Sequence, residues 1–271
     1  LNSSTGAITG TPTATSGATT YTVTVTDTNS ATASNTFSLA VNSAVTATQS
    51  VASKTLTQNA AATSFTPVTG ANGTPSLTYS VLPSLPSGLS LNTGTGAITG
   101  TPTVSSGAST YTVTVTDANS ATASNTFSLT VNTAVTATQS VASATVTVNT
   151  AITSFTPVTG GGGTSPLSYG ISPTLPAGLS FNTANGQVSG TPTVTSSTTT
   201  YTVTVTDSNN GTASNTFQLT VNGPVSATQA IASKALTQNA AATSFTPVTG
   251  SGGTPPLSYG VAPALPTGLT L

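Results

Sequence analysis

The sequence predicts an all-β fold: a rod of small, tandem two-sheet sandwiches, each with about seven strands. Three observations predict it. Whole phrases return at a spacing of 90 residues, as at Leu1, Leu91 and Phe181. Within each repeat, apolar and polar residues alternate over short runs, as they do in half-buried strands. Turn-forming residues separate these runs, and no amphipathic helix pattern occurs.

The 90-residue period also predicts where the domains lie. It is too long for a solenoid repeat that stacks on its neighbours, and long enough for a domain with its own core. We therefore expect complete domains at 43–132 and 133–222. Residues 1–42 then form the C-terminal part of a domain of the same kind, and 223–271 form the N-terminal part of another.

The first half of the domain at 43–132 is predicted to hold three strands. The first is broken in two, over 45–52 and around Thr55–Leu56. The next strand-like run contains Pro67, which has no backbone N–H to donate, so this strand lies at an edge or bulges there. The third, at 77–81, places Leu, Tyr and Val side chains on one face.

The second half of this domain is predicted to hold four strands. Two short ones, near Leu89–Leu91 and Ala97–Thr99, flank a turn rich in Gly, which supplies the positive φ that tight turns need. Strict alternation predicts two longer strands, at 111–117 (YTVTVTD) and 126–132 (TFSLTVN). The turn formers between them indicate a hairpin, with Tyr, Val, Phe and Leu on one face and Thr and Ser on the other.

The Thr-rich outer face of this hairpin has several interpretations. Cross-strand Thr pairs could simply stabilise a sheet that faces water. The hydroxyls could instead carry O-linked sugars, or enter a lateral contact with little desolvation penalty. They could also order water on a lattice, but that needs a flat face, and sheets twist.

Two stretches carry a family resemblance: LPSGLSLNTGTGAITGTPT at 85–103 and YTVTVTDANSATASNTFSLTV at 111–131. Together they resemble the He_PIG family of bacterial Ig-like repeats, which is related to cadherin-like and dystroglycan-type modules. The match recurs at 1–41 and 175–221, so it covers essentially the whole chain. The resemblance implies an Ig-like fold and export from a bacterium, hence an extracellular or cell-surface location. It implies little about ligands, because such domains serve adhesins, stalks and enzyme accessory regions alike.

The Ig-like fold also suggests structural roles for aromatic residues. In Ig sandwiches, a Tyr two residues before the second core Cys ties back to a nearby loop through its hydroxyl. Tyr111 stands two residues before Val113, so this corner is expected to survive although the chain contains no Cys. The residues to which we assign structural roles are Tyr21, Tyr111, Tyr201, Phe37, Phe127 and Phe217.

The composition excludes several classes of partner. Lys and Arg together number 2, Asp and Glu 3, and 2% of residues are charged, against about 25% in an average domain. Gripping a phosphate backbone takes clustered Lys and Arg, so we expect no nucleic-acid partner. No apolar run reaches the length needed to span a bilayer, so we expect no membrane insertion in this segment.

Catalysis is not expected either. A Ser or Thr nucleophile needs an adjacent base, and the chain has no His, no Cys and no Glu. A two-carboxylate hydrolase needs paired acids, whereas each period holds one Asp. We therefore predict a protein that is not an enzyme and that binds no cofactor.

The one carboxylate of each period follows YTVTVT and begins the hairpin turn, at Asp27, Asp117 and Asp207. These residues are the candidates for a calcium ligand of the kind found in cadherin-like linkers. Calcium takes about 6–8 oxygens, usually from several carboxylates, so one Asp per domain is too few. We favour an Asx-type turn, in which the carboxylate accepts hydrogen bonds from backbone N–H groups, and predict no metal site.

The two lysines, Lys54 and Lys234, share one phase, at which the domain between them has Ala144. Some surface Ig domains join a Lys to an Asn by an isopeptide bond, which requires a buried acid beside the pair. Here the only Asp of each domain lies at the hairpin turn, and the domain with Ala144 manages without a Lys. We therefore expect solvated lysines.

The sequence thus favours a structural role, as the shaft of a bacterial extracellular filament or giant surface adhesin. Links such as VNSAVT at 41–46 hold no flexible Gly/Ser tract, which favours a stiff rod. Residues 1–42 and 223–271 are expected to complete one domain between successive units, as head-to-tail self-association, and lateral association is a further expectation. For this completion, one continuous chain is favoured over separate subunits that exchange half-domains.

Two alternatives to the shaft stay open. The chain could be an adhesion module that binds glycans or another cell through the loops at one pole of a domain. It could also be a spacer in a secreted polysaccharide-active enzyme, since repeats of this kind accompany such enzymes.

Overall fold

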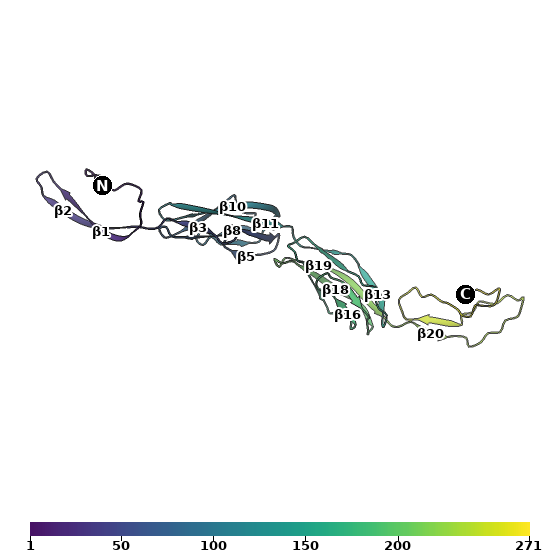
Figure 1. Cartoon of the computed structure of the whole chain (residues 1–271). Helices are drawn as coiled ribbons and strands as arrows, with labels where there is room; N and C mark the ends of the chain where they lie inside the picture. The colour runs from purple at the N-terminus through teal and green to yellow at the C-terminus, as the bar shows by residue number, and fades with distance from the viewer. The chain divides into compact units, whose positions relative to one another are not determined.

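The computed structural model describes all 271 residues, with 21 strands and no helix (Figure 1). The predicted all-β fold is therefore confirmed. The chain divides into two compact units, Leu1–Asn132 and Thr133–Leu271. Each unit contains one complete sandwich and one smaller strand pair. None of the chain forms a helix with the length and apolar character that crossing a membrane takes.

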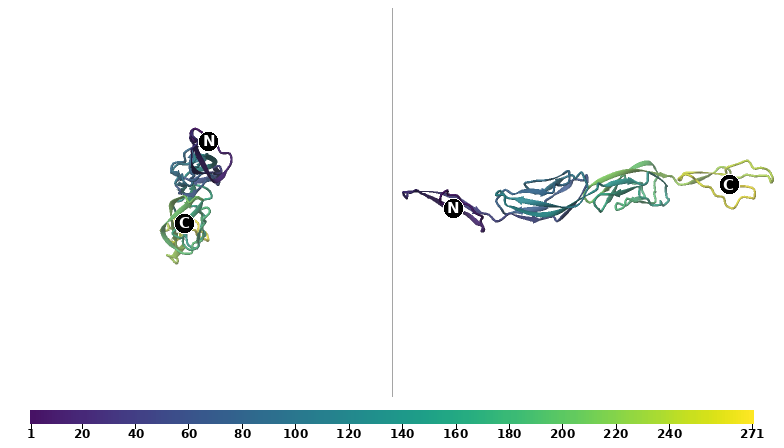
Figure 2. Two further views of the ribbon diagram at one scale, coloured as in Figure 1. Left: turned by 90° about the vertical axis from the view of Figure 1, so that its left-hand side faces the viewer. Right: turned by 90° about the horizontal axis from the view of Figure 1, so that it is seen from above.

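In the first unit, residues 43–132 form a sandwich with two facing layers (Figure 2). Its strands are β3 (Thr46–Gln49), β4 (Ser53–Thr57), β5 (Ala62–Phe65), β6 (Val68–Ala71), β7 (Thr78–Leu82), β8 (Leu89–Leu91), β9 (Ile98–Gly100), β10 (Ser106–Thr116) and β11 (Thr122–Asn132). One sheet has the order β4-β11-β10-β7, in which β4 runs parallel to β11. The sheet β5-β9-β8 and the pair β3-β6 pack against it. If β3 with β4, and β5 with β6, are each counted as one broken strand, the domain has the seven strands that the sequence predicts.

Pro67 marks the break in the second of these strands. β5 and β6 lie on either side of it and belong to different sheets. β5 is an edge strand, and its pairing with β9 is irregular. Pro67 has no N–H to donate, and its carbonyl instead accepts hydrogen bonds from the N–H groups of Ser50 and Val51. The predicted edge position is confirmed, and the chain changes sheets at this proline.

The core of this domain is built around the aromatic side chains of the β10–β11 hairpin. Tyr111 and Phe127 are direct cross-strand partners, and their rings stack with centroids 5.5 Å apart. Phe65, from the opposite sheet, meets Phe127 edge-on at 6.2 Å. Val113 and Val115 are fully buried at alternate positions of β10, as the alternation predicts. Both layers bury their apolar faces in this cluster, which is what holds the sandwich together.

In the second unit, residues 133–222 repeat this architecture. The strands are β12 (Thr136–Gln139), β13 (Ser143–Thr147), β14 (Val158–Gly161), β15 (Ser168–Ser172), β16 (Leu179–Phe181), β17 (Val188–Gly190), β18 (Ser196–Thr206) and β19 (Thr212–Asn222). The main sheet again has its N-terminal strand parallel to its last, in the order β13-β19-β18-β15. Tyr201 stacks on Phe217 at 5.4 Å. One difference is that the counterpart of β5 forms only an isolated bridge between Phe155 and Val188.

Each unit also contains part of a further sandwich. At 1–42, β1 (Ser16–Thr26) and β2 (Thr32–Val41) form a hairpin with the same register as β10–β11, including an irregularity at the same point. At 223–271, β20 (Ser226–Gln229) and β21 (Val248–Ser251) pair antiparallel.

Candidate interaction site

The geometry of the hairpin turn is visible at Asp117, which the sequence analysis names as a calcium candidate. Its Oδ1 accepts hydrogen bonds from the N–H groups of Asn119 (3.0 Å) and Ala121 (2.9 Å). Its Oδ2 accepts one from the N–H of Thr74 (2.8 Å), which lies 43 residues earlier in the chain. The Thr74 N–H is the main cause that holds the pKa of Asp117 below its ordinary value. The carboxylate is a clamp between the hairpin turn and the loop that leads into β7.

The other two Asp residues show the same turn. Asp207 repeats all three hydrogen bonds, including one at 2.8 Å from the N–H of Thr164 to Oδ2. Asp27 accepts hydrogen bonds from the N–H groups of Asn29 (2.9 Å) and Ala31 (2.7 Å) within its own turn. No group of three or more His, Cys, Asp or Glu side chains is positioned to hold a metal ion. The sequence anticipates the Asx-type turn, but not the long-range donor, because nothing local marks Thr74 as its partner.

The predicted Tyr corner is made by a different tyrosine. The Tyr79 hydroxyl accepts a hydrogen bond from the N–H of Gly70 at 3.0 Å, and Tyr169 does the same for Gly160 at 3.1 Å. A Cβ on Gly70 would lie 2.5 Å from Val115 Cγ1, so the close approach requires glycine. Tyr111, to which the sequence assigns this tie, contributes its ring to the core instead.

The other predicted structural residues also lie at ring contacts. Tyr201 is buried against Phe217, and burial raises the pKa of Tyr201. Tyr21 stacks on Phe37 with centroids 5.7 Å apart, but on a hairpin that no second sheet covers. The same aromatic pair therefore forms in all three hairpins, whether or not a core surrounds it.

On the outer face of each hairpin, a Thr and a Ser hydroxyl pair across the two strands. Thr114 and Ser124 lie opposite one another on β10 and β11, with 3.0 Å between their hydroxyl oxygens. The corresponding distance is 2.9 Å for Thr24 with Ser34 and for Thr204 with Ser214. Cross-strand pairing, the simplest of the interpretations given to this face, accounts for these hydroxyls.

The sequence predicts a solvated Lys54, but in the structure its ammonium group lies over an aromatic ring. Its Nζ lies over the ring of Phe65, 5.6 Å from the centroid, and the Nζ of Lys234 lies 5.7 Å from that of Phe245. A cation over a ring face is attracted by the quadrupole of the ring. The pair links β4 to β5, the edge strands of the two sheets.

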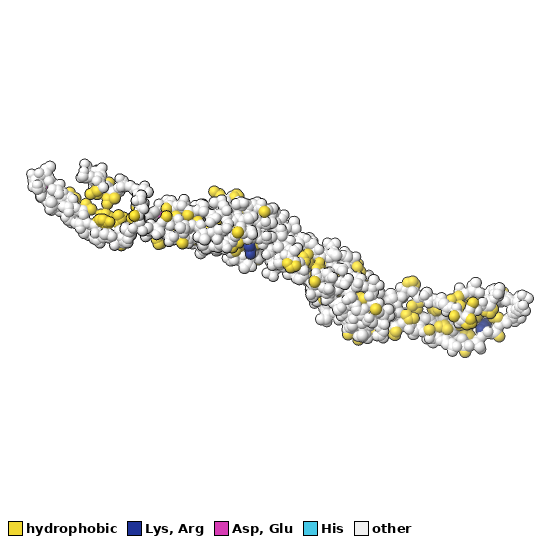
Figure 3. Space-filling view, in the orientation of Figure 1, with side chains coloured by type: hydrophobic (Ala, Val, Ile, Leu, Met, Phe, Trp, Pro, Cys, Tyr) yellow, Lys and Arg dark blue, Asp and Glu magenta, His cyan; other side chains and the backbone are white.

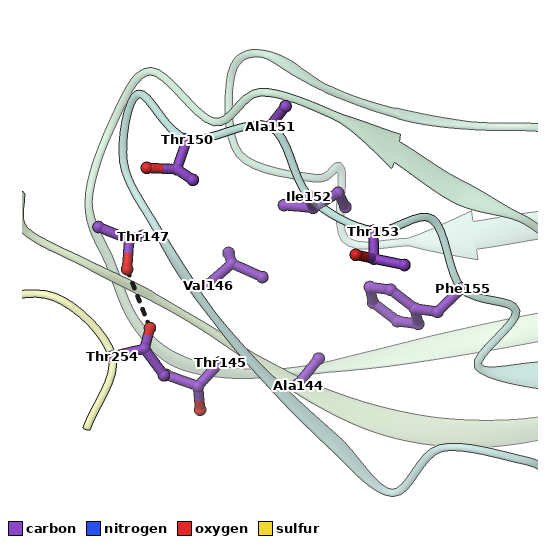
Figure 4. A pocket seen from close by; sticks show the side chains of 10 residues that line it. All are labelled: Ala144, Thr145, Val146, Thr147, Thr150, Ala151, Ile152, Thr153, Phe155 and Thr254. Atoms are coloured by element: carbon purple, nitrogen blue, oxygen red, sulfur yellow. Dashed lines mark hydrogen bonds between the residues drawn. The ribbon is translucent and has the colours of Figure 1, made fainter. Parts of the chain in front are cut away.

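The domain at 133–222 has a pocket where the other domain has this lysine. Ala144 takes its place, and a pocket of about 400 Å³ opens beside Phe155, Val146 and Ile152 (Figure 4). Figure 4 shows these apolar side chains together with the threonine side chains that line the same pocket. Thr147 is hydrogen-bonded there to Thr254 at 3.0 Å between the hydroxyl oxygens.

The inner face of the β1–β2 hairpin exposes apolar side chains in the first unit. We call Tyr21, Val25 and Leu39 the hairpin face. Tyr21 is 45% and Val25 is 68% exposed, whereas their counterparts Tyr111 and Val115 are 5% and 0% exposed. Figure 3 shows this concentration of apolar side chains on the hairpin. Residues whose counterparts form the core at 43–132 are here exposed to solvent.

A matching feature lies in the second unit, at residues 223–271, which we call the cover segment. Tyr259 is 55% exposed, whereas its counterpart Tyr79 in the first domain is 9% exposed. Val248 and Leu265 are exposed as well, and apolar side chains are plainly visible over this segment in Figure 3. The hairpin face and the cover segment are thus two exposed surfaces whose counterparts lie in the core of the domain at 43–132.

Comparison with known proteins gives one match by sequence. The profile of the family He_PIG, described as "Putative Ig domain", matches residues 1–42, 44–132 and 134–222. These three matches cover more than half of the chain. Among curated proteins, no relative matches it.

Comparison with solved structures gives matches to fragments that contain several domains in tandem. The I-band fragment I67–I69 of titin matches at 16% identity and a TM-score of 0.42, over 66% of this chain and 66% of the fragment. A protocadherin Gamma B7 fragment with cadherin domains 1–4 matches at 11% identity and a TM-score of 0.30, over 76% of this chain and 60% of that one. Mouse cadherin-23 EC22–24 matches at 18% identity and a TM-score of 0.28, over 76% of this chain and 74% of that one. At such identities the likeness concerns the fold alone.

Proposed function

The chain belongs to the He_PIG family of Ig domains, and from this premise we propose that it is a structural repeat region. It forms the shaft of a bacterial extracellular filament or giant surface adhesin and works mechanically, without catalysis. One observation carries the proposal: two complete sandwiches repeat one architecture, and each has a core of its own. The ionisable side chains Asp117, Asp207 and Lys54 hold loops and strands together within a domain, which is a structural use of them.

The strand order supports a load-bearing role. A pull on the chain enters the domain at 43–132 at β3, passes to β4 three residues further on, and leaves the domain at the end of β11. β4 and β11 are parallel neighbours over five residue pairs, from Ser53 with Ser128 to Thr57 with Asn132. Pulling the start of one strand and the end of the other therefore slides them past each other. Their hydrogen bonds share the load, whereas a pair that is opened from one end breaks its bonds one after another.

The connections between domains support the same role. β11 ends at Asn132 and β12 begins at Thr136, and β19 ends at Asn222, just before β20 begins at Ser226. Links this short, without a flexible Gly/Ser tract, transmit a pull directly from one domain to the next.

Single-molecule stretching tests this proposal. With handles at the two ends of the chain, we expect a force peak for each of the two complete domains. After each peak the chain lengthens by roughly 3.5 Å per residue released. Extension without force peaks would refute a load-bearing shaft.

A matched control changes only the direction of the pull. The chain contains no cysteine, so handles can be attached at Thr78→Cys and Thr116→Cys. These residues are direct partners on the antiparallel strands β7 and β10, and a pull there opens the pair from one end. We expect a clearly lower peak force than for the pull through β4 and β11. Equal forces would show that the parallel pair does not bear the load.

An adhesion module is the second candidate, and the pocket beside Phe155 is the observation that favours it. Ligand pockets combine apolar and aromatic side chains with a few polar groups, and this pocket has both. Screening the chain and its Ala144→Lys variant against a glycan array tests this candidate. A glycan that binds the chain but not the variant would support this candidate. If no glycan binds, the adhesion module is excluded and the shaft remains as the proposed function.

A further inference from the structure

The pocket beside Phe155 lies where the domain at 43–132 holds a lysine side chain. Lys54 is half-buried there, and its ammonium nitrogen lies 5.6 Å from the centroid of the Phe65 ring. One period later, Ala144 takes the place of Lys54, and Phe155 takes that of Phe65. Alanine lacks three methylene groups and the ammonium of lysine, and a pocket of about 400 Å³ lies at this point (Figure 4).

The two phenylalanine rings are held in the same way. Phe65 meets the core ring of Phe127 edge-on, with 6.2 Å between the centroids. Phe155 meets Phe217 edge-on at 6.0 Å. The backbone of Phe155 is also fixed, because its N–H donates to the carbonyl of Val188 at 3.1 Å. The ring that attracts an ammonium in one domain therefore has an equivalent in the other, at the wall of a pocket.

The rest of the pocket suits a short aliphatic stem that ends in an ammonium. Val146 and Ile152 provide apolar surface for the stem. The three N–H donors of an ammonium need acceptors, and hydroxyl oxygens accept hydrogen bonds. Four threonines of this domain line the pocket: Thr145, Thr147, Thr150 and Thr153. The carboxylate of Asp207 is held in the hairpin turn, so the attraction comes from the ring.

We propose that this pocket binds a primary ammonium group on an aliphatic stem, in the place that the Lys54 side chain occupies in the domain at 43–132. Two sources supply this chemistry: a free alkylamine, and the lysine side chain of another polypeptide. The inference goes beyond the shaft function and does not depend on it. A contact with one ring and a short stem is weak, so the dissociation constant lies in the millimolar range.

Titration of the 271-residue chain with propylammonium chloride, followed by NMR, tests the proposal. The amide signals of the pocket residues should shift and reach saturation. The methylene protons beside the ligand nitrogen should move upfield, because the ring current of Phe155 acts on them. The control is n-propanol, which has the same stem without the charge and should bind roughly 10-fold more weakly. Equal binding of both ligands, or no saturable shift with propylammonium, overturns the proposal.

A second ligand separates the two sources. Nα-acetyl-lysine N-methylamide carries its ammonium on a lysine stem with an uncharged backbone. If it binds as tightly as propylammonium, the pocket accepts the lysine side chain of a polypeptide. If propylammonium binds and the lysine derivative does not, the pocket takes free amines.

Two variants locate the site. Ala144→Lys brings an ammonium of its own to Phe155 and should abolish the response to propylammonium. Phe155→Leu removes the ring and should weaken binding roughly 10-fold. The N–H signal of Gly160, which is hydrogen-bonded to the Tyr169 hydroxyl, reports whether the fold of this domain persists. Unchanged binding to the Ala144→Lys chain would place the ligand elsewhere and would show that the proposal is wrong.

The converse variant is Lys54→Ala. It removes the resident ammonium from the Phe65 ring, so the domain at 43–132 should gain a response to propylammonium that it does not show in the parent chain. The response of the domain at 133–222 should stay as it was, since the two cores are separate. If no response appears at Phe65, the two sites are not equivalent, and the argument from Lys54 to the pocket fails.

Discussion

Asp117 sets how the tip of its hairpin responds to acid. The Thr74 N–H is the main cause that lowers the pKa of Asp117 below its ordinary 3.8, and the N–H groups of Ala121 and Asn119 add to it. A lowered folded-state pKa means that the charged carboxylate stabilises the fold above the ordinary pKa. This stabilisation is lost as the pH falls through the folded-state pKa. We expect the urea midpoint of the domain at 43–132 to stay level down to about pH 5 and to fall below about pH 4.

Asp117→Asn supplies the comparison for this acid response. The amide cannot be charged, and its NH₂ group meets the Thr74 N–H where a carboxylate oxygen accepted it. The variant should unfold at lower urea at pH 7, and its midpoint should change less between pH 7 and pH 3. A variant whose midpoint falls with acid as steeply as that of the parent would rule out the Asp117 clamp as the cause.

Ala144 offers a test of the cation over the ring. Ala144→Lys should place an ammonium over Phe155, as Lys54 lies over Phe65, and should fill the pocket there. We expect the domain at 133–222 to gain about 0.5–1 kcal/mol in its free energy of unfolding. Chemical denaturation measures this, with Ala144→Met as the control that adds an uncharged stem. An equal gain from methionine would assign the effect to packing of the stem.

Single-residue roles were predictable where the signal is local. The Asp117 turn could be predicted because its acceptors and donors lie within four residues. The tie from Tyr79 to Gly70 and the ring under Lys54 could not, since each depends on which segments the sheets bring together. Tyr111 was assigned the tie of Tyr79 because Ig sandwiches place their corner Tyr at that point of the sequence.

At the scale of elements, the turn of the β10–β11 hairpin contains a residue that is poorly suited to its backbone. Ser120 has a φ of 67°, and its counterpart Ser30 has a φ of 68°. Both angles lie in the left-handed region that favours Gly and Asn. The domain at 133–222 has Asn210 at this point, with a φ of 63°. Ser120→Gly should therefore raise the free energy of unfolding by about 0.5–1 kcal/mol. Urea denaturation measures this, and a loss of stability would contradict it.

The strands themselves were predictable to different extents. Alternation predicts the second half of β10, from Tyr111 on, because that pattern is local. Ser106–Thr110 also belong to β10, although they do not alternate, because their backbone pairs with β11 across an irregular register. The change of sheet at Pro67 was only partly predictable. Proline indicates that the ladder stops there, but not that the next residues pair with β3.

At the scale of the whole molecule, separate cores predict separate unfolding. Phe127 belongs to the core at 43–132 and Phe217 to the core at 133–222. Phe127→Ala should destabilise its own domain by about 3–5 kcal/mol, and should leave the other unchanged because the two sites share no packing. Calorimetry should show one transition shifted and one not, with Phe217→Ala giving the converse. If both transitions shift together, the domains unfold as one unit.

The contacts made by the few charged side chains determine how the stability of this protein depends on salt concentration. The Asp117 and Asp207 carboxylates are held by backbone N–H groups, and Lys54 and Lys234 lie over phenyl rings. Dissolved ions screen interactions between exposed, fully charged groups far more than contacts of these kinds. The free energy of unfolding of this protein should therefore be much the same in fresh water and in brine.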